Sequence, residues 1–554
     1  MKKRALLVGI NAKYIHSNLA IRYIRAYVEE QEKKEKAKED LLNYDVLCKE
    51  YSINQSVDYI LHELIASIEI GQGDCIALSC YIWNIEYVHK LIRSLKQIDE
   101  SLVIVLGGPE VSYSAKEEME AFCDIDYILQ GEGEKGFYEL LRALQSGKAL
   151  SMIPSLAYRV KESVVINPAA IGMPMDEIPF PYKDFAELEN RIIYYESSRG
   201  CPFSCQYCLS SIEKGVRFRS LELVKKEIDF FIEHKVRQVK LVDRTFNAKK
   251  EHAHGMMEYI IDKDFGYTNF HFEVAPELVD QEFLNILKQA RSGLFQLEIG
   301  VQTTNEETLR IIQRKNDFAK IDFATRGVKA IQNTHIHLDL IAGLPGEDYA
   351  SFGRSFDYVY GQDPDQLQLG FLKLLKGAGL NRVVEEYGLV AREYPPYEIL
   401  YTKALPYKEA LRLKGIEEMV ESFYNSGQFH YSIRALVQRF HSPFSCFEAL
   451  ADAWFRKGKQ HEKHQKLDLY EFFYDFACEQ FPAEANLWKE ILSFDYAVKE
   501  KPRKHATWME VLQLDVATIK AVLDAARKEN LWEEQFQTYD SKQLSRMFYF
   551  MPMP

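Results

Sequence analysis

Three cysteines within eight residues carry the clearest chemical signal in this sequence. Residues 200–208 read GCPFSCQYC, which spaces Cys201, Cys205 and Cys208 as C-x3-C-x2-C. A tight loop can bring thiolates this close in sequence to one metal centre. Thiolates are soft ligands that select iron-sulfur, zinc or copper over hard cations. A structural zinc site normally has four ligands, and the nearest downstream histidine, His234, falls inside a predicted helix. The sequence therefore favours an iron-sulfur cluster with one iron open to a small molecule.

The remaining cysteines are scattered, mostly in apolar surroundings, and we expect them to be small buried side chains. They are Cys48, Cys75, Cys80, Cys123, Cys446 and Cys478. Nine cysteines in 554 residues are too few for a disulfide scaffold and fit a reducing compartment. The first apolar run is too short for a signal peptide, and no window approaches the roughly 20 apolar residues of a membrane span. We expect a cytoplasmic protein.

Length and composition limit the classes of protein to which this chain can belong. A chain of 554 residues suggests three or four domains at roughly 100 to 200 residues per domain. With 47% hydrophobic and 27% charged residues, the composition is that of a globular protein and excludes disorder, collagen and a membrane bundle. The net charge of −13 excludes a global positive field that would attract polyanions.

Two series of apolar runs alternate with helical stretches, which is the pattern of parallel sheets with crossover helices. The first series predicts strands at 5–10, 45–51, 75–81, 102–108 and 127–131 and a doubly wound, Rossmann-like α/β domain over residues 1–150. The second predicts strands at 191–198, 238–243, 270–275, 294–301, 336–343 and 366–375 and a partial (β/α)6 barrel over residues 191–385. Ligands of such folds bind at the carboxyl ends of the strands, so the residues there carry the most information.

The stretches outside these two series have other patterns. Residues 151–190 begin with a hairpin-like segment and continue with prolines that forbid a helix, which predicts a connector. Residues 386–554 have helical periodicity and contain four of the five tryptophans, namely Trp454, Trp488, Trp508 and Trp532. We predict a mostly helical C-terminal domain with the tryptophans in its core.

The cysteine motif, with Tyr207 before its last cysteine and a six-unit partial barrel after it, resembles the radical S-adenosylmethionine (SAM) superfamily. The resemblance implies that Cys201, Cys205 and Cys208 hold a 4Fe-4S cluster. It also implies that SAM chelates the fourth iron and is cleaved to a 5′-deoxyadenosyl radical.

Segments after the later barrel strands extend this resemblance along residues 191–375. VDRTFN (242–247) is similar to the segment that holds the SAM amino group, although the family's commoner Gly-Gly-Glu is absent. DLIAGLPGE (339–347) resembles the signature whose backbone lies along the adenine. The resemblance implies SAM contacts from Tyr207, Asp243, Glu273, Glu298 and Gln302, with help from Thr245 or Asn247.

Small and polar residues follow the strands of the first domain, in GINAKYIHSNLA (9–20), SCYIWN (79–84), GGPEVS (107–112) and QGEGE (130–134). Glycines after a strand let the backbone approach a large ligand closely. Together with the barrel, these segments resemble the cobalamin-binding subgroup of the superfamily, with a C-terminal helical domain of uncharacterised function. The implied cobalamin contacts are Asn11, His16, Asn18, Ser79, Tyr81, Trp83, Asn84, Gly107, Gly108, Gly131 and Glu132.

One motif of other cobalamin proteins is missing. Asp-x-His-x-x-Gly supplies a lower histidine ligand to cobalt elsewhere, but His16 lacks both the preceding aspartate and the following glycine. This absence argues against a histidine-ligated cobalt more than against cobalamin itself. A doubly wound domain that has lost its cofactor stays an alternative.

The resemblance implies a radical SAM enzyme, with methyl transfer to an unactivated carbon as the first hypothesis. Rearrangement or cyclisation without methyl transfer is an alternative. A hypothesis from another functional class is an iron-sulfur protein that acts as a redox or nucleic-acid-binding protein without SAM turnover. The basic stretch 214–226 would then supply contacts to nucleic acid. The expected partners are a small-molecule or peptide substrate and a flavodoxin- or ferredoxin-type electron donor, with no membrane. Nucleic acid stays open as a further partner.

Overall fold

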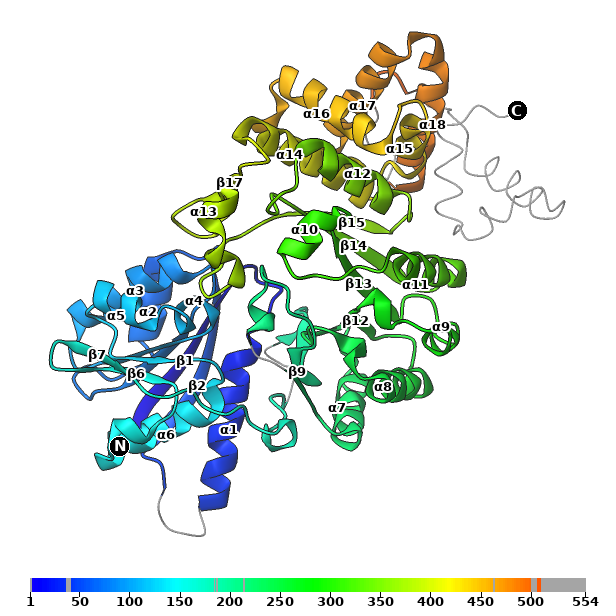
Figure 1. Cartoon of the computed structure of the whole chain (residues 1–554). Helices are drawn as coiled ribbons and strands as arrows, with labels where there is room; N and C mark the ends of the chain where they lie inside the picture. The colour runs from blue at the N-terminus through cyan, green and yellow to red at the C-terminus, as the bar shows by residue number, and fades with distance from the viewer. Residues whose placement is uncertain are drawn as a thin grey trace.

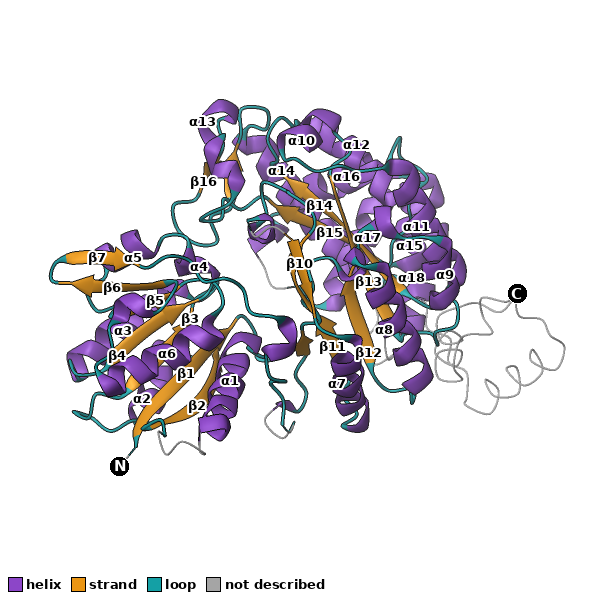
Figure 2. Cartoon of the chain, turned by 60° about the horizontal axis from the view of Figure 1, so that its bottom comes forward, coloured by secondary structure: helices purple, strands orange, loops and turns teal. Residues whose placement is uncertain are grey.

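The computed structural model describes residues 2–35, 41–183, 185, 188–212, 215–461, 464–499 and 506–509. Two α/β units and a helical unit follow one another along the chain, coloured from blue through green to orange (Figure 1). The two sheets stand beside each other in both views, and the helical unit covers one end of the second sheet (Figures 1 and 2).

The first sheet has seven strands in the order β2-β1-β3-β4-β5-β6-β7. Its bounds are β1 Lys3–Asn11, β2 Tyr44–Ser52, β3 Cys75–Ser79, β4 Val103–Gly107, β5 Tyr127–Leu129, β6 Leu156–Val160 and β7 Ser163–Ile166. The first five strands are parallel, and β6 and β7 are antiparallel. The hairpin predicted at the start of the connector therefore belongs to this sheet, because β6 pairs with the open edge of β5.

Helices cover both faces of the first sheet. They are α1 Leu19–Glu35, α2 Val57–Ile65, α3 Ile85–Ile98, α4 Pro109–Ser112, α5 Ala115–Ala121 and α6 Gly133–Ser146. On α3, apolar residues recur at helical spacing, and the side chains of Val88, Leu91 and Leu95 are fully buried against the sheet. Helices α1 and α6 pack on the opposite face. The central strands β1 and β3 are buried on both sides and read as largely continuous apolar runs.

The second sheet is parallel, with the order β15-β14-β13-β12-β11-β8. Its strands are β8 Ile193–Tyr195, β11 Gln238–Leu241, β12 Asn269–Glu273, β13 Phe295–Gln302, β14 His335–Ala342 and β15 Gln366–Phe371. The helices are α7 Leu221–Glu233, α8 Lys250–Lys263, α9 Gln281–Leu287, α10 Glu306–Ile311, α11 Phe318–Ile331 and α12 Tyr349–Tyr360. The single strand predicted at 191–198 is divided. The chain leaves the sheet after Tyr195 and forms an antiparallel pair of β9 Ser198–Cys201 with β10 Gly215–Phe218.

The C-terminal unit begins with a small hairpin and continues as helices. Its elements are α13 Val384–Tyr387, β16 Val390–Ala391, β17 Ile399–Tyr401, α14 Tyr407–Met419, a π-helix Val420–Asn425, α15 His430–Val437, α16 Pro443–Arg456, α17 Lys466–Gln480 and α18 Ala485–Lys499. Trp454 and Trp488 are buried in its core and Trp508 packs against that core, as predicted, whereas Trp532 lies outside the described residues. None of the described helices is both long and apolar enough to cross a membrane.

Candidate cofactor sites

The three motif cysteines line one cavity of about 190 Å³ at the carboxyl ends of the barrel strands, here called the cluster cavity. The motif loop, the turn after β11 and the ends of β12, β13 and β14 form its wall. It is lined by Cys201, Phe203, Cys205, Tyr207, Cys208, Ser210, Ser211, Arg244, Thr245, Glu273, Val274, Ala275, Glu298, Gly300, Gln302, Arg314 and Asp339. The tertiary structure thus brings together the motif and four of the five predicted SAM contacts.

The cysteine sulfurs are free and differ in their surroundings. Cys205 is buried and Cys201 and Cys208 are partly exposed. Burial raises the pKa of the Cys205 thiol. The guanidinium of Arg314, which donates a hydrogen bond to Cys205 Sγ at 3.8 Å, opposes this rise. Within the described residues no three His, Cys, Asp or Glu side chains are arranged to hold a single metal ion. A cluster differs from a single ion because each cysteine binds its own iron.

Backbone bonds fix the cysteine loop from two sides. The amide of Gln206 donates to the carbonyl of Ile312 at 2.9 Å, and the amide of Leu380 donates to the carbonyl of Gln206 at 2.9 Å. The Arg314 guanidinium donates to the Tyr207 hydroxyl at 3.3 Å. The segment after β15 therefore braces the loop together with the end of α10.

Polar side chains on alternate positions of β13 face the cluster cavity. Glu298 accepts from Lys240 Nζ at 3.2 Å and lies 3.0 Å from His271 Nε2. Although burial opposes it, these two groups lower the pKa of Glu298 to about 2. Burial raises the pKa of Glu273. The oxygens Gln302 Oε1 and Asp339 Oδ1 are buried without a partner among the described residues, so the cavity has acceptors to offer a ligand that carries donors.

Asp243 does not line this cavity, contrary to the sequence-based expectation. Its carboxylate accepts from the Ser197 amide at 2.7 Å and from the Ser197 hydroxyl, and its side chain is buried. Burial raises its pKa to about 7. Asn247 bonds both backbone groups of Ala275 and also faces away, whereas Thr245 lines the cavity. Asp243 does follow a barrel strand, as predicted. Its carboxylate, however, joins the segment after β11 to the segment after β8 and so fixes the turn.

A second cavity, of about 510 Å³, lies between the two α/β units and is here called the strand-end cavity. Seven predicted cobalamin contacts line it: Asn11, His16, Asn18, Tyr81, Trp83, Gly131 and Glu132. The rings of Tyr81 and Trp83 stack with centroids 4.4 Å apart and an interplanar angle of 7°. Burial raises the pKa of Tyr81 to about 12. The volume is within the range of organic-ligand sites.

A narrower slot of about 90 Å³ continues from the strand-end cavity into the first domain, and Tyr81 and Gly131 line both. Ser79, Gly107 and Gly108, three more of the predicted cobalamin contacts, line the slot. Gly108 has a φ of +107°, and a Cβ there would lie 2.5 Å from the Cys80 carbonyl oxygen. Only glycine fits this position.

Asn84 lines neither space, contrary to expectation. Its amide donates to the carbonyls of Ile10 and Ser79 at 3.0 and 2.9 Å, and the side chain is fully buried. It also accepts from the Tyr81 amide at 2.8 Å. Asn84 therefore fixes the loop that presents Tyr81 and Trp83.

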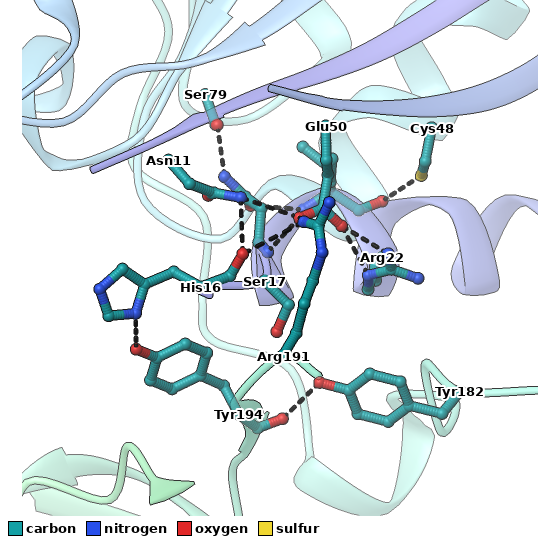
Figure 3. Close-up of polar contacts among 12 residues, drawn as sticks. Asn11, His16, Ser17, Arg22, Cys48, Glu50, Ser79, Tyr182, Arg191 and Tyr194 are labelled. Atoms are coloured by element: carbon teal, nitrogen blue, oxygen red, sulfur yellow. Dashed lines mark hydrogen bonds and ion pairs between the residues drawn. The ribbon is translucent and has the colours of Figure 1, made fainter. Parts of the chain in front are cut away.

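His16 stands where the two α/β units meet (Figure 3). Its Nδ1 lies 2.7 Å from the Tyr194 hydroxyl of the barrel. Burial, Lys13 and Lys240 lower the pKa of His16, so the imidazole is neutral near pH 7. Beside it, Glu50 bonds Arg22, Asn11 and Arg191, which comes from the segment before β8 (Figure 3). This polar network holds the β1–α1 loop against the barrel.

Charged residues that the sequence did not single out complete the walls. Arg199 pairs with Glu134 at 2.6 Å and Glu132 at 3.4 Å across the boundary between the two α/β units, and with the nearby Glu196 at 2.8 Å. Asp339 and Arg314 line the cluster cavity, and Arg244 lines both cavities. In the sequence, only their positions near the ends of strands indicated that these residues could line a site. That they converge on the cavities depends on tertiary structure.

Both arginines of the basic stretch after the cysteines bond to other parts of the protein. Arg217 pairs with Glu132, and Arg219 is buried and pairs with Glu227 at 2.6 Å. Lys226 pairs with Glu222 on the same helix. These two arginines therefore join elements of the protein.

Family models match three parts of the chain. A B12 binding domain matches residues 5–141, the radical SAM superfamily matches residues 195–359, and a protein of unknown function, DUF4080, matches residues 385–553. The chain is a radical SAM protein with an N-terminal B12-binding domain and a C-terminal domain of the DUF4080 family. The resemblance drawn from the sequence is confirmed.

Two curated relatives span most of this chain. The cobalamin-dependent radical SAM methyltransferase TokK of Streptomyces tokunonensis is 25% identical over 419 residues, which are 70% of this chain and 58% of TokK. The 2-(S-pantetheinyl)-carbapenam-3-carboxylate methyltransferase of Streptantibioticus cattleyicolor is 25% identical over 432 residues, 68% of this chain and 61% of that enzyme. This chain therefore spans about three fifths of their length.

Solved structures share the fold. The radical SAM methyltransferase TsrM from Kitasatospora setae, with cobalamin and a [4Fe-4S] cluster bound, superposes with a TM-score of 0.61 at 15% identity, over 83% of this chain and 100% of TsrM. The cobalamin-dependent S-adenosylmethionine radical enzyme OxsB, with aqua-cobalamin and SAM bound, superposes with a TM-score of 0.61 at 14% identity. The superposition covers 99% of this chain and 83% of OxsB. The predicted fold class is confirmed.

Proposed function

We propose that this chain is a cobalamin-dependent radical SAM enzyme that transfers a methyl group to an unactivated carbon. The observation that carries the proposal is that the cluster cavity and the strand-end cavity are adjacent and meet at Arg244. A cluster with SAM supplies a carbon radical and cobalamin supplies a methyl group, so both sites must open onto one substrate. The named activities of TokK and the carbapenam methyltransferase support this reaction class.

The cysteine loop provides the ligand set of a 4Fe-4S cluster. Cys201, Cys205 and Cys208 would each bind one iron and leave the fourth for SAM. The positive charge of Arg314 next to Cys205 Sγ favours the thiolate form that an iron requires. A flavodoxin- or ferredoxin-type protein would deliver the electron.

The polar wall of the cluster cavity suits SAM. The unpartnered oxygens of Gln302 and Asp339 would accept hydrogen bonds from its amino and ribose hydroxyl groups. Glu298, held ionised by Lys240 and His271, would complement its positive charge, together with Glu273. The Tyr207 ring would form one side of this site.

The strand-end cavity and its slot suit cobalamin. The slot at Ser79, Gly107 and Gly108 would hold the nucleotide tail, because glycines let the backbone approach it closely. The stacked Tyr81 and Trp83 rings offer a flat apolar surface to the corrin. Asn11, His16, Asn18, Gly131 and Glu132 would surround its edge.

We also propose domain limits at 1–150, 151–190, 191–385 and 386–554, with the β6–β7 hairpin of the connector joined to the first domain, and a cytoplasmic location. The scattered free cysteines support a reducing compartment. The substrate would be a small molecule or a peptide, because the arginines of the basic stretch are engaged within the protein.

Anaerobic reconstitution of the full chain with iron, sulfide and cobalamin tests the proposal. We expect absorption bands of both cofactors, release of 5′-deoxyadenosine from SAM, and transfer of a 13C label from the SAM methyl group to bound cobalamin. Cys205→Ala should abolish SAM cleavage, whereas Cys123→Ala, an exposed cysteine elsewhere, should not. Release of 5′-deoxyadenosine by a protein that binds no cobalamin would refute methyl transfer.

Rearrangement or cyclisation is the second candidate. The anaerobic magnesium-protoporphyrin IX monomethyl ester cyclase of Rubrivivax gelatinosus is 22% identical over 345 residues, 59% of this chain and 60% of that enzyme. Cobalamin binding and 5′-deoxyadenosine release without any movement of the 13C label would favour this reaction class.

A further inference from the structure

The lining residues of the cluster cavity and of the strand-end cavity have one member in common, Arg244. Arg244 lies in the turn that follows β11, at the carboxyl end of this barrel strand. Its charge acts on both sides, because it opposes the burial-driven rise in the pKa of Tyr81 in the first domain and of Glu273 in the barrel. Arg244 therefore occupies the passage between the two proposed cofactor sites.

The Arg244 side chain is exposed and makes no hydrogen bond or ion pair with any residue that the structure describes. The other arginines of these walls are engaged. Arg199 pairs with three glutamates, and Arg314 bonds Cys205, Tyr207, Asn316 and the Gly300 carbonyl. Within the described walls, Arg244 is thus the cation that is free to bind a ligand.

The backbone under Arg244 is held firmly. The carboxylate of Asp243 bonds the Ser197 amide at 2.7 Å, and the Thr245 hydroxyl donates to the Arg244 carbonyl at 2.7 Å. The Val242 amide donates to the Tyr195 carbonyl at 2.9 Å. A free guanidinium on a rigid turn loses little backbone freedom when it binds an anion.

The cavity walls near Arg244 are rich in carboxyl groups, so an anionic ligand could bind there only beside a positive charge. Glu273, Glu298 and Asp339 line the cluster cavity, and Glu132, Glu134 and Glu196 line the strand-end cavity. These carboxyl groups would repel a carboxylate or phosphate unless a positive charge met it. A guanidinium binds either anion through two parallel hydrogen bonds.

We propose that Arg244 binds an anionic group, a carboxylate or a phosphate, of the substrate and so holds the substrate between the two cofactor sites. The inference rests on the proposed function, because only a substrate that both cofactors must reach belongs in this passage. It limits the substrate to organic acids and phosphorylated compounds.

Chemical labelling tests the proposal without any cofactor. Phenylglyoxal modifies free guanidinium groups, and peptide mass spectrometry of the full chain reports each arginine separately. We expect succinate and inorganic phosphate to slow modification of Arg244 more than succinamide does at equal ionic strength. Arg326, an exposed arginine on α11, is the internal control and should not be protected. Equal protection of both arginines, or none of Arg244, would overturn the proposal.

Reconstituted holoenzyme provides the second readout. A pool of carboxylates and phosphate esters, but not the matched pool of methyl esters and amides, should raise 5′-deoxyadenosine release above its substrate-free level. Arg244→Gln should need roughly ten- to hundredfold more of the anionic pool for the same rise, because a charge-assisted hydrogen-bond pair is lost. Arg244→Lys should keep part of the response, and Arg326→Gln all of it.

Three results would overturn the proposal: a response to the neutral pool, no response to the anionic pool, or an unchanged response in Arg244→Gln. Weaker SAM binding by Arg244→Gln in calorimetry would assign the guanidinium to SAM and overturn it as well. Failure of the proposed function looks different, because the wild-type protein would then release no 5′-deoxyadenosine while protection of Arg244 by anions persisted.

Discussion

At the scale of single residues, the cysteine loop depends on Arg314. Its guanidinium reaches Cys205 Sγ at 3.8 Å and the Tyr207 hydroxyl at 3.3 Å, and it also bonds the Gly300 carbonyl. A positive charge this close to a proposed cluster ligand would favour the reduced cluster, which carries one more negative charge. We therefore expect Arg314 to tune the proposed cluster in addition to lining its cavity.

We predict that Arg314→Leu lowers the reduction potential of the reconstituted cluster by on the order of 60 mV, one tenfold change in a one-electron equilibrium. Arg314→Lys should shift it much less, because the charge is kept. Potentiometry followed by electron paramagnetic resonance measures both variants. A potential in Arg314→Leu equal to that of the wild type would contradict this role.

Glu298 gives a prediction on pH. Its folded-state pKa of about 2 lies below its ordinary value of 4.5. The carboxylate therefore stabilises the fold above pH 4.5, and this contribution of about 3 kcal/mol is lost as the pH falls toward 2. Glu298→Gln should lower the Tm clearly at pH 6 and by less at pH 3. Calorimetry checks the trend, with the exposed Glu251→Gln as control; a gap that widened in acid would contradict it.

At the scale of elements, strand β15 is the outer edge of the barrel sheet and needs partners for its outward backbone groups. The side chain of Asn425, at the end of the π-helix, supplies them. Its Oδ1 accepts from the Leu367 amide at 2.9 Å and its Nδ2 donates to the Leu367 carbonyl at 2.8 Å. The C-terminal unit thus covers an edge that the barrel leaves open.

Asn425→Ala should destabilise the protein by about 1–3 kcal/mol, because both backbone groups of the buried Leu367 lose their partners. Calorimetry should show a Tm several degrees lower. Asn381→Ala, which removes a single exposed bond to the Leu375 carbonyl, is the control and should change little. If the two variants have the same Tm, Asn425 does not stabilise the edge.

At the scale of the whole molecule, the segment after β15 ties the barrel to the first domain. Glu110, at the start of α4, is buried and accepts from the Tyr397 hydroxyl at 2.5 Å and from Lys376 Nζ at 3.0 Å. The same segment braces the cysteine loop at Gln206. The relative position of the two proposed cofactor sites therefore depends on the contacts of this segment as well as on the residues that line the cavities.

Replacing Glu110 by alanine should free this segment. We expect trypsin to cleave at Lys373, Lys376 or Arg382 roughly tenfold faster, because cleavage follows the population of the opened segment and 1.4 kcal/mol is tenfold. Glu117→Ala, exposed on α5, is the matched control. Mass spectrometry of timed digests identifies the sites. Identical digests of the two variants would show that the contact is dispensable.

Local sequence determined the elements and the chemical type of the sites. The runs that predicted β1, β3 and β4 formed strands, because fully buried parallel strands need continuous apolar sequence. The runs that predicted β11 to β15 also formed strands, and in β11, β13 and β15 every second residue is buried. The spacing of the three cysteines gave the ligand type, since soft thiolates close in sequence share a short loop. Gly108 indicated a position where the backbone approaches another group closely, which the structure shows to be the Cys80 carbonyl.

Only the tertiary structure decided which strand-end residues face a cavity. Asp243 and Asn84 stand at strand ends like Glu273 and Trp83, yet their carboxylate and amide bond to neighbouring strands and loops. Whether a polar side chain binds its own fold or a ligand depends on partners distant in sequence. For the same reason, the ion pairs of Arg199 with Glu132 and Glu134 and the free guanidinium of Arg244 emerge only once the two sheets stand side by side.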